Sequence, residues 1–301
     1  MSKILVVGSI NMDLVVRVSD PPKPGETVLG SDFETFPGGK GANQAVAASR
    51  MGGQVTMVGR VGSDDFGDEL IQTLVDDRIK TTYVIKDPQA ATGIAMITVS
   101  RNGENMIVVA AGANYKVSVE DVINARTLMR ESDILLVQLE CPLEAVEEAI
   151  KLANVYNLPV VLNPAPAQTV SKVLLRSVDY LTPNQMELAR LTGETDIDRG
   201  IQKLLSWGVR NLIITLGHNG ARVVSEEIDQ HVPAYEITAV DTTAAGDAFN
   251  GALAVALAEK KTLLEAVRYG MAAGALTATK RGAQPSLPTR DAVEQLLKSQ
   301  K

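Results

Sequence analysis

A carboxylate stands among small residues in the segment VDTTAAGDAFNGALAVALAE, which covers residues 240–259. This order of residue types predicts the end of a strand, a turn, and then a helix with Asp247 in its first turn. Such a turn exposes backbone N–H groups and the helix dipole adds positive charge, so the segment is suited to hold a phosphate. Asp247 is then either a general base beside that phosphate or an acid that only stabilises the helix start.

Three glycines surround a lysine in FPGGKGANQAVAASR, residues 36–50, directly before another predicted helix. A Walker A loop needs glycine where Glu34 stands, and a dinucleotide fingerprint needs glycine where Gln44 stands, so both nucleotide motifs fail. Glycines can instead let backbone N–H groups approach a small polar ligand, with Lys40 and Asn43 as further donors. The alternative is a glycine-rich turn in which Asn43 satisfies one end of the helix.

Other acids allow both a structural and a chemical interpretation. Asn184 and Glu187 lie three residues apart in TPNQMELARL, which is typical of a helix capping box, while Glu187 could also hold water around magnesium. Glu140 follows an apolar strand and could orient a sugar hydroxyl or remain a solvated strand-end acid. Because His218 and His231 are the only histidines, acid–base chemistry falls to carboxylates.

The elements that must position these residues alternate along the chain, which predicts an α/β fold with a mainly parallel sheet covered on both faces. Short apolar runs predict strands at residues 4–7, 55–58, 134–137, 160–162, 180–181 and 212–215. Helical patterns cover residues 66–76, 119–130, 143–156, 185–191, 201–207, 248–259, 263–278 and 290–298. We expect a single domain with one main core over residues 1–301.

Two stretches break this rhythm. Residues 12–36 contain several prolines between alternating segments, and residues 93–109 have the pattern of a hairpin that turns at Asn102-Gly103. Together they predict a small separate sheet, inserted into the main domain. Such a sheet would be a lid over the carboxyl ends of the parallel strands, where α/β proteins bind ligands.

Composition limits the partners and the location. The 301 residues carry a formal net charge of −7 and only 4% aromatic residues, so we expect no nucleic-acid partner. The single cysteine, Cys141, cannot form an internal disulfide. The apolar run at residues 4–10 is too short for a signal sequence or a membrane span. The sequence therefore predicts a soluble, cytoplasmic protein without a membrane partner.

Taken together, these motifs resemble the ribokinase (PfkB-type) carbohydrate kinase family over essentially the whole chain. The segment GGKGANQA, residues 38–45, is similar to the family's N-terminal signature, and DTTAAGD, residues 241–247, is similar to its C-terminal signature. The segments NMD at 11–13, VQLECP at 137–142 and NPAPA at 163–167 resemble the ribokinase branch of the family. One position departs: the common family pattern has glycine at Ala244, and alanine tolerates positive φ less well.

The resemblance implies a role for each matching residue. The substrate-binding positions would be Asn11, Asp13, Gly39, Lys40, Asn43, Glu140 and Asp247. Asp247 would take the proton from the ribose 5-hydroxyl, and the backbone amides of Ala244, Ala245 and Gly246 would form the anion hole. The nucleotide positions, with magnesium held by Glu187 through water, would be Asn184, Glu187, Thr215, Gly217, Gly220, Gly246 and Met271. A potassium-type ion would be bound at Asp241, Thr243, Thr277, Lys280, Gly282 and Ser286.

The implied fold is a three-layer α/β/α domain with a small β-sheet lid, through which members of the family commonly dimerise. The implied activity is the transfer of a phosphoryl group from ATP to O5 of D-ribose, with Mg²⁺ required and K⁺ as activator. The sequence allows three other functions. The first is a kinase of the same family that acts on deoxyribose, another sugar or a nucleoside, and the second is a sugar-binding protein that has lost catalysis. The third, a nucleotide-dependent oxidoreductase, is disfavoured because the dinucleotide fingerprint is missing.

Overall fold

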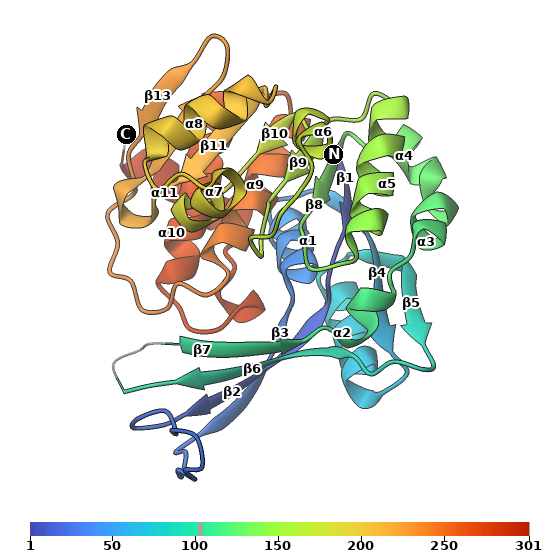
Figure 1. Cartoon of the computed structure of the whole chain (residues 1–301), viewed down its shortest axis with the longest axis vertical. Coiled ribbons are helices and arrows are strands. Elements are labelled where there is room, and N and C mark those ends of the chain that lie inside the picture. Colours follow the sequence, from blue (N-terminus) through green and yellow to red (C-terminus); the bar gives the residue numbers. More distant parts are fainter. Residues whose placement is uncertain (102–104, 301) are drawn as a thin grey trace.

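A computed structural model describes residues 1–101 and 105–300, and its main sheet runs through the centre of the molecule (Figure 1). Within these residues the main sheet has nine strands, in the order β13-β12-β11-β10-β9-β8-β1-β4-β5. Their bounds are Lys3–Val7 (β1), Gln54–Gly62 (β4), Lys80–Asp87 (β5), Ile134–Val137 (β8), Val160–Leu162 (β9), Tyr180–Leu181 (β10), Asn211–Thr215 (β11), Ala221–Val224 (β12) and Asp229–Val232 (β13). All neighbouring pairs are parallel except β11–β12 and β12–β13. The prediction of a mainly parallel sheet is confirmed.

Side chains alternate between two apolar layers, as the period of a strand requires. In β1, Ile4 and Val6 pack into one buried cluster, while Leu5 and Val7 pack into the other. The first layer holds α1 (Lys40–Arg50), α2 (Asp65–Asp76), α9 (Ala245–Ala258), α10 (Leu263–Ala278) and α11 (Arg290–Ser299). The second layer holds α3 (Val119–Asn124), α4 (Arg126–Glu131), α5 (Leu143–Val155), α6 (Lys172–Arg176), α7 (Gln185–Thr192) and α8 (Ile197–Ser206). The three-layer α/β/α arrangement is therefore confirmed.

A second, smaller sheet stands apart from the main one, below it in Figure 1. Its strands follow the order β3-β2-β6-β7 and are β2 (Asn11–Arg17), β3 (Phe33–Gly38), β6 (Gly93–Val99) and β7 (Asn105–Ala110). Strands β2 and β6 pair in parallel, while β3 and β7 pair antiparallel to them. The separate sheet predicted from two distant stretches is confirmed, but the turn predicted at Asn102-Gly103 lies outside the described residues.

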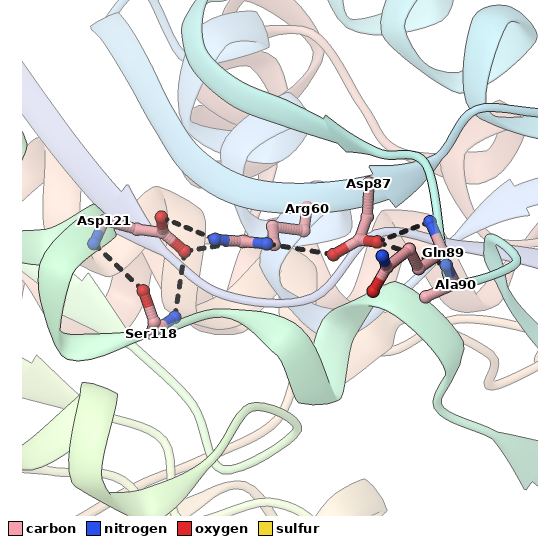
Figure 2. A network of polar contacts seen from close by, with 6 residues as sticks. All are labelled: Arg60, Asp87, Gln89, Ala90, Ser118 and Asp121. Atoms are coloured by element: carbon pink, nitrogen blue, oxygen red, sulfur yellow. Dashed lines mark hydrogen bonds and ion pairs between the residues drawn. The ribbon is translucent and has the colours of Figure 1, made fainter.

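Polar side chains fix the points where the chain crosses between the sheets. The Asn114 side chain, in a short 3-10 helix (Gly112–Lys116), accepts from Ile10 N–H at 2.8 Å and donates to Asn11 Oδ1 at 2.6 Å. Figure 2 shows the Arg60 guanidinium between two carboxylates, with Nε donating to Asp121 at 2.7 Å and Nη1 donating to Asp87 at 2.9 Å. Asp87 ends β5 and accepts the N–H groups of the following turn, from which the chain enters β6.

Several boundaries differ from the sequence prediction. The helix expected over residues 119–130 is divided into α3 and α4 at Ala125. Helix α9 begins at Ala245, three residues before the predicted start at residue 248, so Asp247 lies within its first turn. Strands β5, β12 and β13 were not predicted. Among the described residues, we find no helix that is both long and apolar enough to cross a membrane.

Candidate active site

The strand order reverses between β1 and β8, and the segments that follow these strands meet at the carboxyl edge of the sheet. The Ser9 hydroxyl donates to Glu140 Oε2 at 2.5 Å, and the backbone N–H of Lys40 donates to the same oxygen at 3.0 Å. Three segments that are distant in the sequence are therefore joined on one carboxylate. Such a reversal point is where open α/β sheets bind their ligands.

The packing of the backbone explains the glycines around Lys40 without any ligand. A Cβ on Gly41 would lie 2.5 Å from the Ser9 backbone nitrogen, because the start of α1 packs directly on the chain that leaves β1. Gly39 has φ +86° and precedes the helix, and a Cβ there would lie 2.7 Å from the Asn11 nitrogen. Close packing therefore requires the bare backbone, and it brings Lys40 and Asn43 to the sheet edge.

Asp247 is buried where α1 and α9 begin side by side. Asn43 Nδ2 donates to Asp247 Oδ2 at 3.0 Å, and Gln44 Nε2 donates to Oδ1 at 3.0 Å. The two helices approach closely because Gly251 has no side chain: a Cβ there would lie 2.6 Å from the Cβ of Ala47. Both carboxylate oxygens are thus held by amide donors, while each oxygen keeps a further lone pair for a substrate proton.

The turn before α9 contains one residue with positive φ and leads directly into the first turn of the helix. Ala244 has φ +58°, so the position where the common family pattern has glycine does adopt the left-handed conformation. Alanine there costs roughly 1 kcal/mol relative to a relaxed backbone. The N–H of Gly246 lies in the first turn of the helix, where the backbone N–H groups have no acceptor in a preceding turn. Apart from the chain neighbours of Gly246 and the backbone of its own helix, no heavy atom of the described residues lies within 4 Å of the position that a Cβ on Gly246 would take. The Ala245 N–H, by contrast, already donates to Thr242 O at 3.2 Å.

Several carboxylates share one cation at this edge. Burial, with the charges of Glu140 and Asp247, raises the pKa of the Asp13 carboxyl to about 7. Burial alone would lower the pKa of Lys40, but the surrounding carboxylates, with Asp247 the strongest, raise it above its ordinary value. Burial also raises the pKa of Glu187. The site therefore holds its lysine charged and has more negative than positive groups.

The predicted nucleotide positions lie at the ends of neighbouring strands. Asn184 and Glu187 form the capping box of α7, with Glu187 N–H and Asn184 Oδ1 2.8 Å apart, so the structural interpretation of this pair is observed. Asn184 also bridges to Thr215 at the end of β11. Gly217 and Gly220 border the next turn with φ +60° and +92°. Met271 is buried on α10, in the same apolar layer as α9.

Three of the predicted cation positions, Asp241, Thr243 and Gly282, are joined by hydrogen bonds between two loops. Asp241 Oδ1 accepts from the Thr243 N–H at 2.9 Å, and Oδ2 accepts from the Gly282 N–H at 3.0 Å. Burial raises the pKa of Asp241, but the hydrogen bonds from the Thr243 hydroxyl and from these two N–H groups outweigh it and keep the pKa below its ordinary value. Lys280 follows the end of α10, where its N–H donates to Thr277 O at 3.1 Å. The remaining predicted position, Ser286, is fully buried in the short 3-10 helix Gln284–Ser286.

A cleft of about 460 Å³ separates these loops from the smaller sheet. Asp13 and Phe36 line it from the smaller sheet, and Asp241, Thr243 and Gly282 line it from the loops. Among the described residues, no group of three or more histidine, cysteine, aspartate or glutamate side chains is arranged to hold a metal ion.

Several buried polar residues beside Asp247 were given no role by the sequence analysis. Gln44, Gln138, Asn163, Thr182 and Asn250 are each 7% exposed or less and are joined by side-chain hydrogen bonds. The one signal for them in the sequence is a polar residue inside an apolar run, such as Gln138 after ILLV or Asn250 within an alanine-rich helix.

The raised pKa of Asp13 predicts a pH-dependent cost to stability. The unfolded chain loses this proton near pH 3.8 and the folded protein near pH 7, so the folded state binds more protons in this window and loses stability as pH rises. We expect the free energy of unfolding of Asp13→Asn to exceed that of the parent protein by about 2 kcal/mol at pH 8 and to differ little from it at pH 4. Urea unfolding at both pH values measures this, with exposed Asp20→Asn as control. A variant no more stable than the parent at pH 8 would contradict it.

Comparison with known proteins agrees with this geometry. The chain is 43% identical to a ribokinase of Haemophilus influenzae, covering 95% of both chains, and 41% identical to a ribokinase of Bacillus subtilis, covering 99% of this chain and all of that one. A deoxyribokinase of Salmonella typhi is 37% identical and covers 95% of both chains.

Solved structures agree as well. A crystal structure of a ribokinase from Thermotoga maritima superposes with a TM-score of 0.91 at 41% identity, over 99% of this chain and all of that one. The structure of an Arabidopsis thaliana ribokinase complexed with ribose and ATP superposes with a TM-score of 0.90 at 34% identity, over 99% of both chains. The family described as pfkB family carbohydrate kinase matches residues 1–290. The chain therefore belongs to the pfkB family of carbohydrate kinases.

Proposed function

We propose that this protein phosphorylates D-ribose at O5 with ATP, giving D-ribose 5-phosphate and ADP, with Asp247 as general base. One observation carries the proposal: the Asp247 carboxylate is fixed by amide donors directly beside the open first turn of α9 at Gly246. A base and an anion cradle one residue apart are what transfer of a phosphoryl group to an alcohol needs.

Ribose would be held by the polar groups around this base. Asn11, Asp13, Gly39, Lys40, Asn43 and Glu140 are the proposed ligands of its hydroxyls. Asn43 supports this directly, because its Oδ1 is buried without a hydrogen-bond partner among the described residues while its Nδ2 is bound to Asp247. A ribose hydroxyl would supply the missing donor. Asn11 Oδ1 already accepts from Asn114, and the Asn11 amide N–H₂ would be the donor to the sugar.

ATP would lie along the strand ends that lead away from Asp247. Thr215, Gly217, Gly220 and Met271 are the proposed nucleotide contacts, and the N–H groups at residues 244–246 would face the transferring phosphoryl group. Because Ala245 N–H is already engaged with Thr242, Gly246 is the strongest candidate donor. A bound magnesium ion would neutralise phosphate charge, held by phosphates and water, with Asn184 and Glu187 nearby. The excess of carboxylates over Lys40 fits such a cation.

A potassium-type ion would lie at the loops around Asp241. The Asp241 carboxylate, whose pKa lies below its ordinary value, would be one oxygen ligand and backbone carbonyls of the two loops would be others, because a hard cation prefers oxygen ligands. An ion there would fix the loop that ends at Ala244, and would so set the shape of the anion cradle.

The smaller sheet is the proposed lid over the ribose site. In this proposal the lid is an insertion in a single domain that spans residues 1–301. The cytoplasmic location stays a prediction. We further propose that two copies pair through this sheet. Its strands β6 and β7 expose apolar side chains, with Met96, Met106 and Val108 each about half exposed. Met96 and Val108 are direct neighbours across β6 and β7, so they lie on one face.

The dimer predicts a specific response to charge on that face. We expect the parent protein to sediment as a dimer at micromolar concentration, and Val108→Glu to sediment as a monomer, because an apolar interface does not accept an unpaired carboxylate. An exposed apolar residue elsewhere, Val173→Glu on α6, serves as control and should remain dimeric. A monomeric parent protein would refute the proposal.

A substrate panel tests the activity itself. We expect ADP release with ribose to exceed that with deoxyribose, fructose or adenosine, to require Mg²⁺, and to be faster in potassium than in sodium. Asp247→Asn should lower kcat by roughly 10³-fold while ribose binding stays measurable, because the loss is that of a general base. The control is Asp65→Asn, which removes an exposed acid from the first turn of another helix.

Each alternative has its own outcome in this panel. Preference for deoxyribose would match the deoxyribokinase relative and would retain the fold and Asp247. Binding of ribose without ADP release would favour the sugar-binding protein. Near-normal turnover by Asp247→Asn would remove Asp247 from the role of base.

A further inference from the structure

The Gln44 side chain is fully buried and uses its whole amide group. Its Nε2 donates to Asp247 Oδ1 and to Asn163 Oδ1, both at 3.0 Å, and its Oε1 accepts from Gln138 Nε2 at 2.6 Å. Two donors and one acceptor bond leave this amide little freedom to rotate. Gln44 therefore connects the carboxylate at the start of α9 to the segments that follow β8 and β9.

A backbone carbonyl sets the direction of these hydrogen bonds. The oxygen of Thr182 can only accept, so Asn163 must turn its Nδ2 toward it, as it does at 3.2 Å. The Oδ1 of Asn163 then faces Gln44 and requires a donor there. Gln44 must therefore present Nε2, and the same nitrogen reaches Asp247. A flipped Gln44 would instead place an oxygen against the carboxylate.

The same network reaches the anion cradle. The Thr182 hydroxyl donates to Asn250 Oδ1 at 2.6 Å, and Asn250 Nδ2 donates to the carbonyl oxygen of Gly246 at 2.8 Å. One set of buried amides thus fixes both the carboxylate of Asp247 and the peptide unit just before it. Among the described members of this network, only Gln138 Oε1 is buried without a hydrogen-bond partner, and a buried polar network with nearly all of its groups paired is rigid.

We propose that Gln44 is a positioning residue for phosphoryl transfer: its amide, oriented by Asn163, fixes the rotamer of Asp247 and keeps the carboxylate free to accept a substrate proton. The inference rests on the proposed function, since it assigns Gln44 to the same base. Gln44 acts through Asp247 and makes no proposed contact with ribose. Its loss should therefore change turnover more than substrate affinity.

The test compares Gln44→Met, which keeps the length but removes the amide, with Gln44→Glu and with Leu204→Ala. Leu204 is fully buried in α8, in the opposite apolar layer, so this variant controls for a general loss of stability. We expect Gln44→Met to lower kcat about 100-fold, as expected for a misplaced catalytic group, with the KM for ribose within about threefold of the parent value. Leu204→Ala should keep the parent kcat.

Gln44→Glu adds a readout that loss of stability alone does not move. It places a second carboxyl against Asp247, so the pair shares a proton and the acidic limb of the kcat profile moves to higher pH by about one unit or more. The other charged groups that act on Asp247 are Asp13 from β2, Lys40 from α1 and Glu187 from α7, and all are unchanged in this variant.

The outcomes separate the inference from the function on which it rests. If the parent protein turns over ribose but Gln44→Met loses no more kcat than Leu204→Ala, Gln44 has no positioning role. A rise in KM equal to the fall in kcat, or an unmoved acidic limb in Gln44→Glu, also overturns the inference. If Gln44→Met does not fold, the pH profile of Gln44→Glu decides alone. A parent protein inactive on every sugar refutes the proposed function, and this inference with it.

Discussion

The candidate site depends on the direct packing of one helix start against two other backbones. Helix α1 begins on the chain that leaves β1 and crosses α9 at Gly251, and glycine is required at each contact because a Cβ would overlap backbone or side-chain atoms. This packing places Lys40 against Glu140, and Asn43 and Gln44 against Asp247. A small displacement of α1 would separate all these groups at once.

The charge distribution of the site costs stability. Asp13 is buried among other carboxylates, which raises its pKa to about 7, and Lys40 is the cation held among them. A site built only for stability would contain fewer acids. Ionisable groups with strongly shifted pKa values are common at functional sites, and natural proteins often give up some stability there.

Much of the fold could be predicted from the sequence, because parallel strands that are buried on both faces read as apolar runs. Strand β5 was missed since it lies at the sheet edge with a mixed pattern, and β13 was missed since it is mostly exposed. The break at Ala125 has no glycine or proline to mark it.

For the site, the residue types were readable but their contacts were not. Asn43 and Asp247 lie 204 residues apart, and the hydrogen bond between them follows only from the packing of α1 on α9. Gln44 illustrates the same limit: in the sequence it only breaks a dinucleotide motif, whereas in the structure it holds the proposed base. The sequence left open whether the glycines around Lys40 serve a ligand or a turn, and it could not show that the packing of the backbone also requires them.

The central claim is that Asp247 faces the ribose 5-hydroxyl beside the phosphate cradle of α9. A crystal structure of the protein with ribose and a non-hydrolysable ATP analogue tests it most directly. The account predicts O5 within about 3 Å of an Asp247 oxygen, as a general base requires, with the terminal phosphate at the Gly246 N–H. Ribose bound with another hydroxyl toward Asp247, or a terminal phosphate distant from the first turn of α9, would contradict it.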